Sequence, residues 1–236
     1  MSASANEKAD FSKLIELIQK LYNYKHISFD LWLTLIRSNP EFKQERNRLF
    51  KDFFKIEKPM DEVNAVIRKF DVLTNYINER VGKNFDTLEI YFLILDALSV
   101  DLEKIEIEQF NTFYDLTEDL LMKHKPLLLD DKLPQTLENL YKEGKTMNIL
   151  SNTAFIKGRT LKKIMKHYEV EDYFSFQIYS DEAGVSKPNN MIYQLAYDEI
   201  VKINDIAKSE IIHVGDNRNS DYDGAKKFGF DAHLIV

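Results

Sequence analysis

Cysteine is absent from the 236 residues, and tryptophan occurs only once. The lack of cysteine excludes disulfide bonds, thiolate metal ligands and a cysteine nucleophile. Long apolar runs are also absent: no stretch approaches the roughly 20 apolar residues of a membrane-spanning helix, and the opening sequence MSASANEKAD lacks the apolar segment of a signal peptide. We therefore expect a cytoplasmic protein with no membrane partner.

A strong excess of positive charge is missing as well. Lysine and arginine total 32, aspartate and glutamate total 39, and the formal net charge is −7. Both signs are spread along the chain, which argues against a general surface for nucleic acid. A local pocket for a small anion remains compatible with this composition, and 44% hydrophobic residues are sufficient for a sizeable core.

Helical spacing of apolar residues dominates the first half of the chain. Residues 8–24 predict a lead-in helix, and the chain from about 41 to 125 consists of long, charged segments with helical periodicity. Breaker and polar stretches divide this region into about four helices, at 41–54, 61–81, 85–98 and 105–124. We expect residues 38–125 to form a helical bundle inserted into another domain.

Strands and helices alternate in the rest of the chain. Short, mostly apolar runs predict strands at 26–30, 146–151, 174–180, 210–216 and 231–236, and helical segments separate the last four. Strands separated by helices of this length form parallel sheets with right-handed crossovers. We therefore predict a Rossmann-like, doubly wound α/β core built from residues 1–37 and 126–236.

Polar side chains collect where the predicted strands end. The residues at or just beyond these ends are Asp30, Ser151, Asn152, Lys187, Asp216 and Asp221. The carboxyl ends of parallel strands converge on one crevice, so we expect these residues to lie together. Carboxylates bind Mg²⁺, while hydroxyl and ammonium groups neutralise phosphoryl oxygens. His213, by contrast, lies inside an apolar strand, which favours a core histidine over a ligand.

Four segments together resemble the haloacid dehalogenase-like (HAD) hydrolase superfamily, in the division whose helical cap is inserted soon after the first strand. They are ISFDLWLTL, NILSN, GVSKPNNMIY and IIHVGDNRNSDYDGA, in the family's order, and they cover the core from about residue 26 to the end. The first and last are the most specific. The resemblance implies that the helical bundle is a cap that closes over the site and selects the substrate.

The resemblance implies roles for several of these residues. Asp30 is expected to act as the nucleophile and form a covalent aspartyl intermediate, and Lys187 to keep Asp30 ionised. Ser151 is expected to hydrogen-bond the transferring group. Thr34, Asn152 and Trp32 are expected to lie beside the substrate.

The resemblance also implies a Mg²⁺ site. Its expected ligands are Asp30, Asp216 and the backbone carbonyl of Trp32, with Asp221 acting directly or through water. In phosphatase members the position of Trp32 holds an aspartate that is the general acid and base, and indole cannot transfer a proton at neutral pH. Trp32 is then either a packing residue under the cap or a stacking platform for the substrate.

Three functions fit this sequence. The retained Asp216 favours a Mg²⁺-dependent phosphatase that acts on a small phosphorylated metabolite. Trp32 fits a 2-haloacid dehalogenase-like hydrolase, because those relatives lack the second aspartate and halide leaves without a proton. The third function, of a different class, is a catalytically weak binding or regulatory protein that keeps the shape of the site.

Overall fold

The computed structural model describes residues 20–235 and has a five-stranded parallel sheet at its centre. The strands are β1 (His26–Phe29), β4 (Thr146–Ser151), β5 (Phe176–Tyr179), β6 (Ile211–Gly215) and β7 (Asp231–Leu234), in the spatial order β5-β4-β1-β6-β7. The central strand β1 pairs in parallel with both β4 and β6, and the strand order reverses there. The predicted Rossmann-like sheet is confirmed, while most of the predicted lead-in helix lies outside the described residues.

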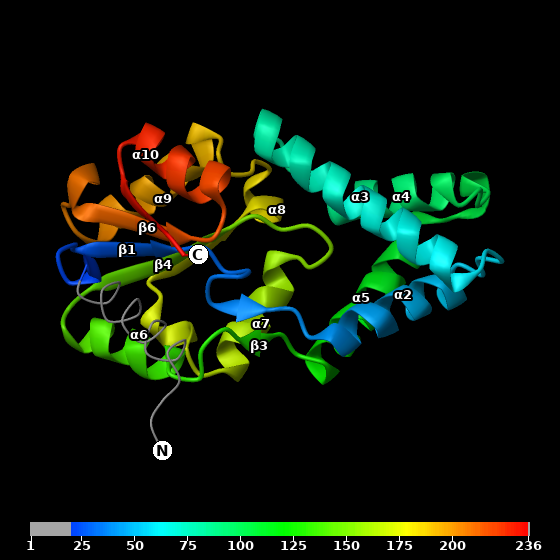
Figure 1. Cartoon of the computed structure of the whole chain (residues 1–236), viewed down its shortest axis with the longest axis horizontal. Helices are drawn as coiled ribbons and strands as arrows, with labels where there is room; N and C mark the ends of the chain where they lie inside the picture. Colours follow the sequence, from blue (N-terminus) through cyan, green and yellow to red (C-terminus); the bar gives the residue numbers. More distant parts are fainter. Residues whose placement is uncertain (1–19, 236) are drawn as a thin grey trace, which may run out of the picture.

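Helices cover both faces of this sheet, as Figure 1 shows. α6 (Leu133–Lys142) and α7 (Gly158–His167) lie on one face, and α9 (Asn190–Ile203) and α10 (Gly224–Phe228) lie on the other. The buried side chains of each layer form a separate apolar cluster with the strands. Because both faces are covered, all five positions of β6 are buried, and its sequence IIHVG does not alternate between apolar and polar residues.

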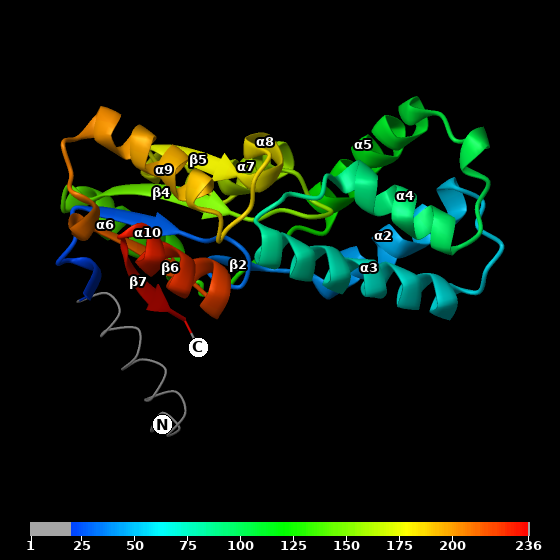
Figure 2. The ribbon, with the colours of Figure 1, turned by 90° about the horizontal axis from the view of Figure 1, so that it is seen from above.

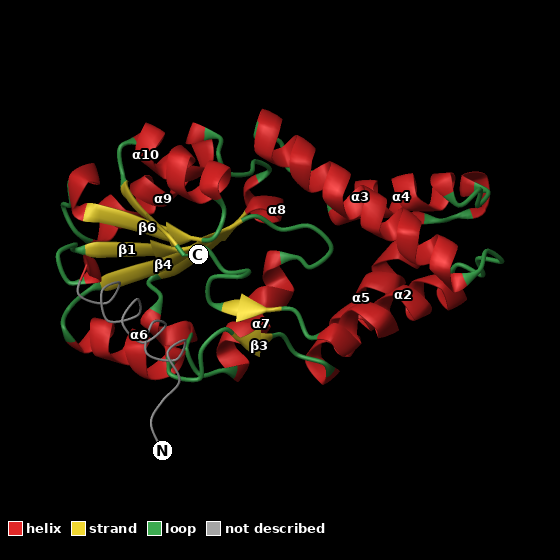
Figure 3. Cartoon of the chain, viewed as in Figure 1, coloured by secondary structure: helices red, strands yellow, loops and turns green. Residues whose placement is uncertain are grey.

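A helical insertion occupies the chain between β1 and β4. Helices α2 (Pro40–Phe53), α3 (Met60–Val81), α4 (Thr87–Ala97) and α5 (Ile107–Lys123) share their own buried core, which is rich in aromatic rings. We use the name helical insertion for residues 38–126. Figure 2 shows it beside the sheet rather than stacked on either face, and Figure 3 shows its helical character.

A short antiparallel ribbon joins the two ends of the helical insertion. β2 (Ile36–Arg37) pairs with β3 (Leu127–Leu128), so the chain leaves the core and returns to it at the same place. The sequence does not predict this ribbon, because two-residue strands are too short to show a period. The domain division at residues 37/38 and 125/126 stays a prediction.

Local capping sets the ends of the inserted helices. Asn39 accepts a hydrogen bond from the backbone N–H of Glu41 at the start of α2, and Asp86 forms a capping box with Glu89 at the start of α4. α3 ends at Val81, and its C-cap is Gly82, whose φ of 66° is in the left-handed region that glycine adopts without steric cost. The observed helices agree with the four helices predicted from apolar periodicity and breaker stretches.

The last predicted helix, over 220–230, differs from the structure. The chain forms a wide π-helical turn, η4 (Arg218–Asp223), before the short helix α10. The side chain of Asn217 accepts hydrogen bonds from the backbone N–H groups of Asn219 and Ser220, and this local bonding begins the turn. No helix in residues 20–235 has the length and apolarity needed to cross a lipid bilayer.

His26 makes the stability of this fold depend on pH. It begins β1, is fully buried, and contacts Thr146 Oγ1 through Nδ1 at 2.7 Å and Asn148 Oδ1 through Nε2 at 2.8 Å. Burial lowers the pKa of His26 from 6.5 to about 4, although the hydrogen bond to Asn148 opposes this shift. Between pH 6.5 and pH 4 the unfolded chain therefore binds more protons at this residue, and stability falls as the pH falls.

We predict that this loss is specific to the histidine. Between pH 7 and pH 5 the wild-type protein should lose about 2 kcal/mol more unfolding free energy than His26→Gln, which has no group that titrates there. Urea unfolding of both proteins at the two pH values measures the difference, and other titrating groups cancel in the comparison. Equal losses in the two proteins would show that His26 is not held neutral by the fold.

Candidate active site

Asp30 lies at the carboxyl edge of the sheet, immediately after β1. Its backbone N–H donates to Val214 O at 2.8 Å, which continues the ladder between β1 and β6 by one residue. The chain then turns sharply, and Leu33 takes a φ of 59°, in the left-handed region that glycine favours. The turn brings the N–H groups of Leu35 and Ile36 back to Leu31 O. Asp30 is therefore held at a fixed place, and the residue is only 6% exposed.

Three predicted site residues meet the carboxylate of Asp30. Oδ1 accepts hydrogen bonds from Lys187 Nζ at 2.8 Å and from Ser151 Oγ at 3.1 Å. Oδ2 accepts one from Thr34 Oγ1 at 3.4 Å. Oδ2 is therefore the less heavily hydrogen-bonded oxygen of the pair.

Lys187 forms the centre of the site. Its ammonium group is buried and donates to Asp221 Oδ1 at 2.6 Å as well as to Asp30. The backbone of Lys187 is held by Asn152 through two reciprocal bonds: Asn152 Nδ2 donates to Lys187 O at 3.0 Å, and Lys187 N donates to Asn152 Oδ1 at 2.8 Å. The loop between α8 (Ser180–Ala183) and α9 is thereby attached to the end of β4, which directs the long side chain inward.

The close approach of Asp221 depends on a glycine. A Cβ atom on Gly215, the last residue of β6, would overlap the carboxyl group of Asp221. The same carboxyl group accepts a hydrogen bond from Asn217 N through Oδ2 at 2.9 Å. Asp216, which lies between Gly215 and Asn217 in the sequence, is only half-buried. The π-helical turn and the bare backbone of Gly215 together direct Asp221 toward Lys187.

Asp30, Asp216 and Asp221 form an acidic cluster. One carboxylate oxygen from each lies within 4.8 Å of the others. Lys187 supplies one positive charge to this group of three carboxylates, and burial lowers the pKa of nearby His213. When all three carboxylates are ionised, the cluster keeps a surplus of two negative charges.

The charges of the site shift its protonation equilibria. Burial raises the pKa of Asp30 to about 6, against the opposing influence of Lys187. Burial alone also raises the pKa of Asp221, but Lys187 and His213 outweigh it and hold that pKa well below its ordinary value. For Lys187, burial lowers the pKa, and the carboxylates of Asp221 and Asp30 more than reverse this effect. Lys187 is thus an ammonium ion shared between two buried acids.

His213 belongs to the layer beneath the site, which the sequence does not reveal. It is buried in β6, as predicted for a core histidine, but its Nε2 lies 3.2 Å from Asp221 Oδ1 and 3.5 Å from Lys187 Nζ. Its Nδ1 lies 3.0 Å from Ser28 Oγ on β1. A histidine three residues before Asp216 gives no signal of this contact, because only the η4 turn returns Asp221 to it.

A cavity of about 550 Å³ lies between the core and the helical insertion. Asp30, Lys187, Asp216 and Asp221 are at its core side, and α2 and α3 provide much of the opposite wall. Trp32 lines the cavity and also packs against the apolar cluster of the sheet. Its position is therefore compatible with a packing residue and with a stacking platform for the substrate. This volume is in the range of small-molecule binding sites.

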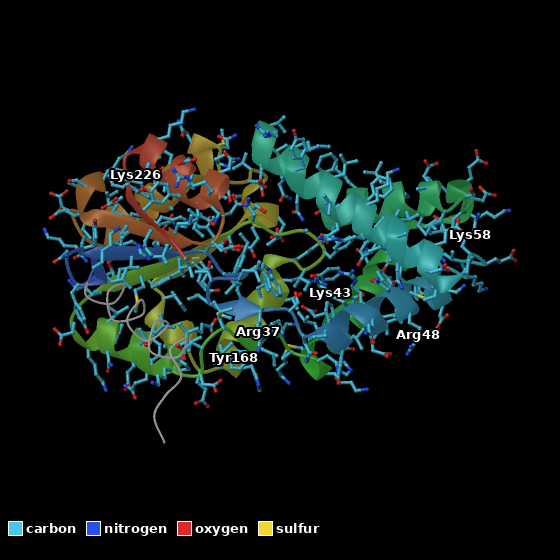
Figure 4. The ribbon with its side chains drawn as sticks, viewed as in Figure 1. Arg37, Lys43, Arg48, Lys58, Tyr168 and Lys226 are labelled. Atoms are coloured by element: carbon cyan, nitrogen blue, oxygen red, sulfur yellow. The ribbon has the colours of Figure 1, made fainter. Side chains whose placement is uncertain are left out.

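Side chains of the helical insertion reach this cavity. Figure 4 shows Lys43 of α2 in the space between the insertion and the core, whereas Arg48 of the same helix lies on the outer side. Glu79 of α3 accepts a hydrogen bond from Asn217 Nδ2 at 2.8 Å, which ties the insertion to the strand end beside Asp216. The sequence does not identify these contacts, because they depend on how the insertion packs on the core.

Known proteins share this sequence pattern. The family model described as haloacid dehalogenase-like hydrolase matches residues 24–229. Glyceraldehyde 3-phosphate phosphatase of Pyrococcus furiosus is 27% identical over 205 residues, which cover 87% of this chain and 78% of that protein. Haloacid dehalogenase-like hydrolase domain-containing protein 3 of Xenopus laevis is 28% identical over 101 residues, and this match spans 43% of the chain and only 38% of that relative.

Solved structures share the fold. The putative HAD-hydrolase YfnB from Bacillus subtilis, bound to magnesium, superposes with a TM-score of 0.67 at 16% identity, over 90% of this chain and 89% of that chain. A 2-haloacid dehalogenase from Pseudomonas syringae gives a TM-score of 0.60 at 20% identity, over 90% and 86%. At these identities the likeness concerns the fold. With the family model covering residues 24–229, the chain belongs to the haloacid dehalogenase-like hydrolases.

Proposed function

We propose that this protein is a Mg²⁺-dependent phosphatase that hydrolyses a small phosphorylated metabolite through an aspartyl-phosphate at Asp30. The observation that carries the proposal is the cluster of Asp30, Asp216 and Asp221 at the base of a cavity, with Lys187 paired to Asp30 and Asp221. The similarity to a phosphatase over 87% of the chain supports the same reaction class.

The acidic cluster fits a hard divalent cation. Mg²⁺ prefers oxygen ligands and keeps several waters, so it needs only a few carboxylates from the protein. Asp30 and Asp216, with Asp221 directly or through water, would hold it, and the Trp32 carbonyl would be a further ligand. One Mg²⁺ ion would balance the surplus of two negative charges. When bound, Mg²⁺ would offset charge on the phosphoryl oxygens and position the phosphate.

The chain's own residues then account for the transfer. A carboxylate oxygen of Asp30 attacks phosphorus, a new O–P bond forms, and the bond from phosphorus to the leaving oxygen breaks. Lys187 favours the ionised form of Asp30 and lies next to the developing negative charge. Water next attacks phosphorus, phosphate departs, and the Asp30 carboxylate is restored. Ser151 and Thr34 hold the two oxygens of Asp30 in place.

Protonation of the leaving oxygen requires a source other than Trp32. Its indole N–H has no acidity that suits this role at neutral pH. We propose that the proton comes from water or the substrate, and that turnover is slow for this reason. The helical insertion would act as a cap that excludes bulk water from the cavity.

The same tryptophan favours a second candidate function, a 2-haloacid dehalogenase. Halide leaves without a proton, so Asp30 would form an alkyl ester that water hydrolyses, with no requirement for the missing acid. Asp216 argues against this reaction, because three carboxylates this close together favour a bound cation, and the displacement of halide by Asp30 does not need one. Halide release that is independent of Mg²⁺ would identify the dehalogenase.

We predict that Asp30→Asn abolishes Mg²⁺-dependent phosphate release. The amide is a poor nucleophile, so kcat should fall by about a thousandfold or more. A panel of small phosphate monoesters and short 2-haloacids, assayed with Mg²⁺ and with excess EDTA, measures this. Asp131→Asn, which changes an exposed aspartate outside the site, should stay within about twofold of wild type.

The outcomes separate the three functions. Phosphate release that survives EDTA or Asp30→Asn would contradict the proposal. Halide release in EDTA would establish the dehalogenase. A folded protein that binds panel compounds and releases neither product would be a binding protein.

We predict that Trp32→Asp raises phosphate turnover. Because a positioned general acid contributes roughly a hundredfold to ten-thousandfold, we expect a gain of about tenfold or more in kcat. Trp32→Asn is the matched control, since it opens the same space and offers no proton. Equal activity in the two variants would mean that protonation does not limit the reaction.

A further inference from the structure

Arg46 is a buried cation in the wall of the cavity opposite Asp30. It belongs to α2, its side chain lines the cavity, and the residue is only 8% exposed. Arginine is rarely buried to this extent without a carboxylate partner, because its charge loses the solvation of water. Within residues 20–235 no aspartate or glutamate forms an ion pair with Arg46.

Aromatic rings hold the guanidinium group of Arg46. Its Cζ lies 4.4 Å from the centre of the Phe155 ring, which follows β4 in the core, and 6.0 Å from that of Phe42, one turn earlier on α2. Rings at the face of a guanidinium stabilise its charge but accept none of its in-plane hydrogen bonds. The core and the helical insertion thus fix the group together, with its edge left for another partner.

The hydrogen bonds of Arg46 are incomplete. Nε and Nη2 both donate to Asn47 Oδ1, at 3.1 and 2.9 Å. Asn47 is itself held by a bond from its Nδ2 to Asn64 Oδ1 at 2.8 Å, which links α2 to α3. A guanidinium has five N–H groups. The other N–H groups of Arg46 have no acceptor among the described residues.

Neighbouring side chains do not neutralise the positive charge of Arg46. The cavity wall also contains Arg68 and Asp71, which pair with each other at 2.9 Å. Lys43, one turn before Arg46, lines the same cavity and has no ion-pair partner in the described part of the chain. The α2 side of the cavity is therefore cationic, whereas the side at Asp30 is acidic.

We infer that Arg46 binds a second anionic group of the substrate, so that the enzyme prefers phosphate monoesters that also carry a carboxylate or a second phosphate. This inference rests on the proposed phosphatase function. A planar guanidinium with free N–H groups matches the two oxygens of either anion, and a partly desolvated site strengthens the bond. Lys43 adds charge from the same side. Arg46 is thus a specificity-determining residue at the opposite side of the cavity from Asp30.

Matched substrate pairs test the inference. 3-Phosphoglycerate and glycerol 3-phosphate differ by a carboxylate, and fructose 1,6-bisphosphate and fructose 1-phosphate differ by a phosphate. Arg46→Gln should raise KM about tenfold to a hundredfold for the doubly anionic member of at least one pair, with kcat nearly unchanged. The singly anionic member should change by about twofold or less. The pair that responds identifies the anion.

Two further variants control for structure. Arg48→Gln removes an arginine two residues away on α2 that is exposed and pairs with Glu45, and it should leave both members of each pair unchanged. Arg46→Lys keeps the charge without the planar fork and should lie between wild type and Arg46→Gln. An equal loss on both members of every pair, or no loss on either, would overturn the inference. Melting temperatures of the variants identify any general loss of folding.

A binding measurement keeps this inference separate from the proposed reaction. Trp32 is the sole tryptophan and lines the cavity, so its fluorescence should report the binding of 3-phosphoglycerate or fructose 1,6-bisphosphate. Arg46→Gln should weaken this binding by about tenfold or more. Absence of turnover on every ester would refute the phosphatase alone, while equal affinity of wild type and Arg46→Gln for both compounds would refute the role of Arg46.

Discussion

The ammonium group of Lys187 lies between the buried carboxylates of Asp30 and Asp221, at 2.8 and 2.6 Å. Without this cation, two carboxylates would share a space from which water is excluded, and leaving one partner of such a buried pair unpaired costs about 3–5 kcal/mol. Other residues hold Lys187 and Asp221 in position. Asn152 fixes the backbone of Lys187, and Gly215 leaves room for Asp221. The geometry of the site therefore depends on residues at the ends of several strands.

The helical insertion provides a cationic wall opposite the acidic cluster of the core. Asn217 joins Glu79 of the insertion beside Asp216, while Arg46 stacks on Phe155 of the core. The cavity between them thus combines a negative side that suits a metal ion with a cationic side that suits an anion. Such a division would orient a substrate with its phosphate at Asp30 and its remaining anionic group at α2.

Sequence patterns predict the fold, and they also select most of the residues that the structure brings together at the candidate site. The alternation of strands and helices, the breaker stretches between the inserted helices, and the polar strand ends all depend on short-range chemistry, and the structure agrees with them. Sequence patterns do not predict the places of His213, Arg46 and Glu79 at the site. His213 reaches Asp221 only through a π-helical turn, and the other two reach the cavity only through packing of the insertion on the core. These contacts depend on an irregular turn or on packing between distant segments, and a local sequence period predicts neither.

The central claim is that Asp30 carries the phosphoryl group during turnover. The most direct measurement is mass spectrometry of the peptide that contains Asp30, after rapid acid quenching of the enzyme during hydrolysis of a phosphate monoester with Mg²⁺. We expect one added phosphoryl group, located on Asp30, that appears with substrate and Mg²⁺ and disappears when substrate is exhausted. Steady phosphate release with the phosphoryl group found on another residue, and never on Asp30, would contradict the proposed mechanism.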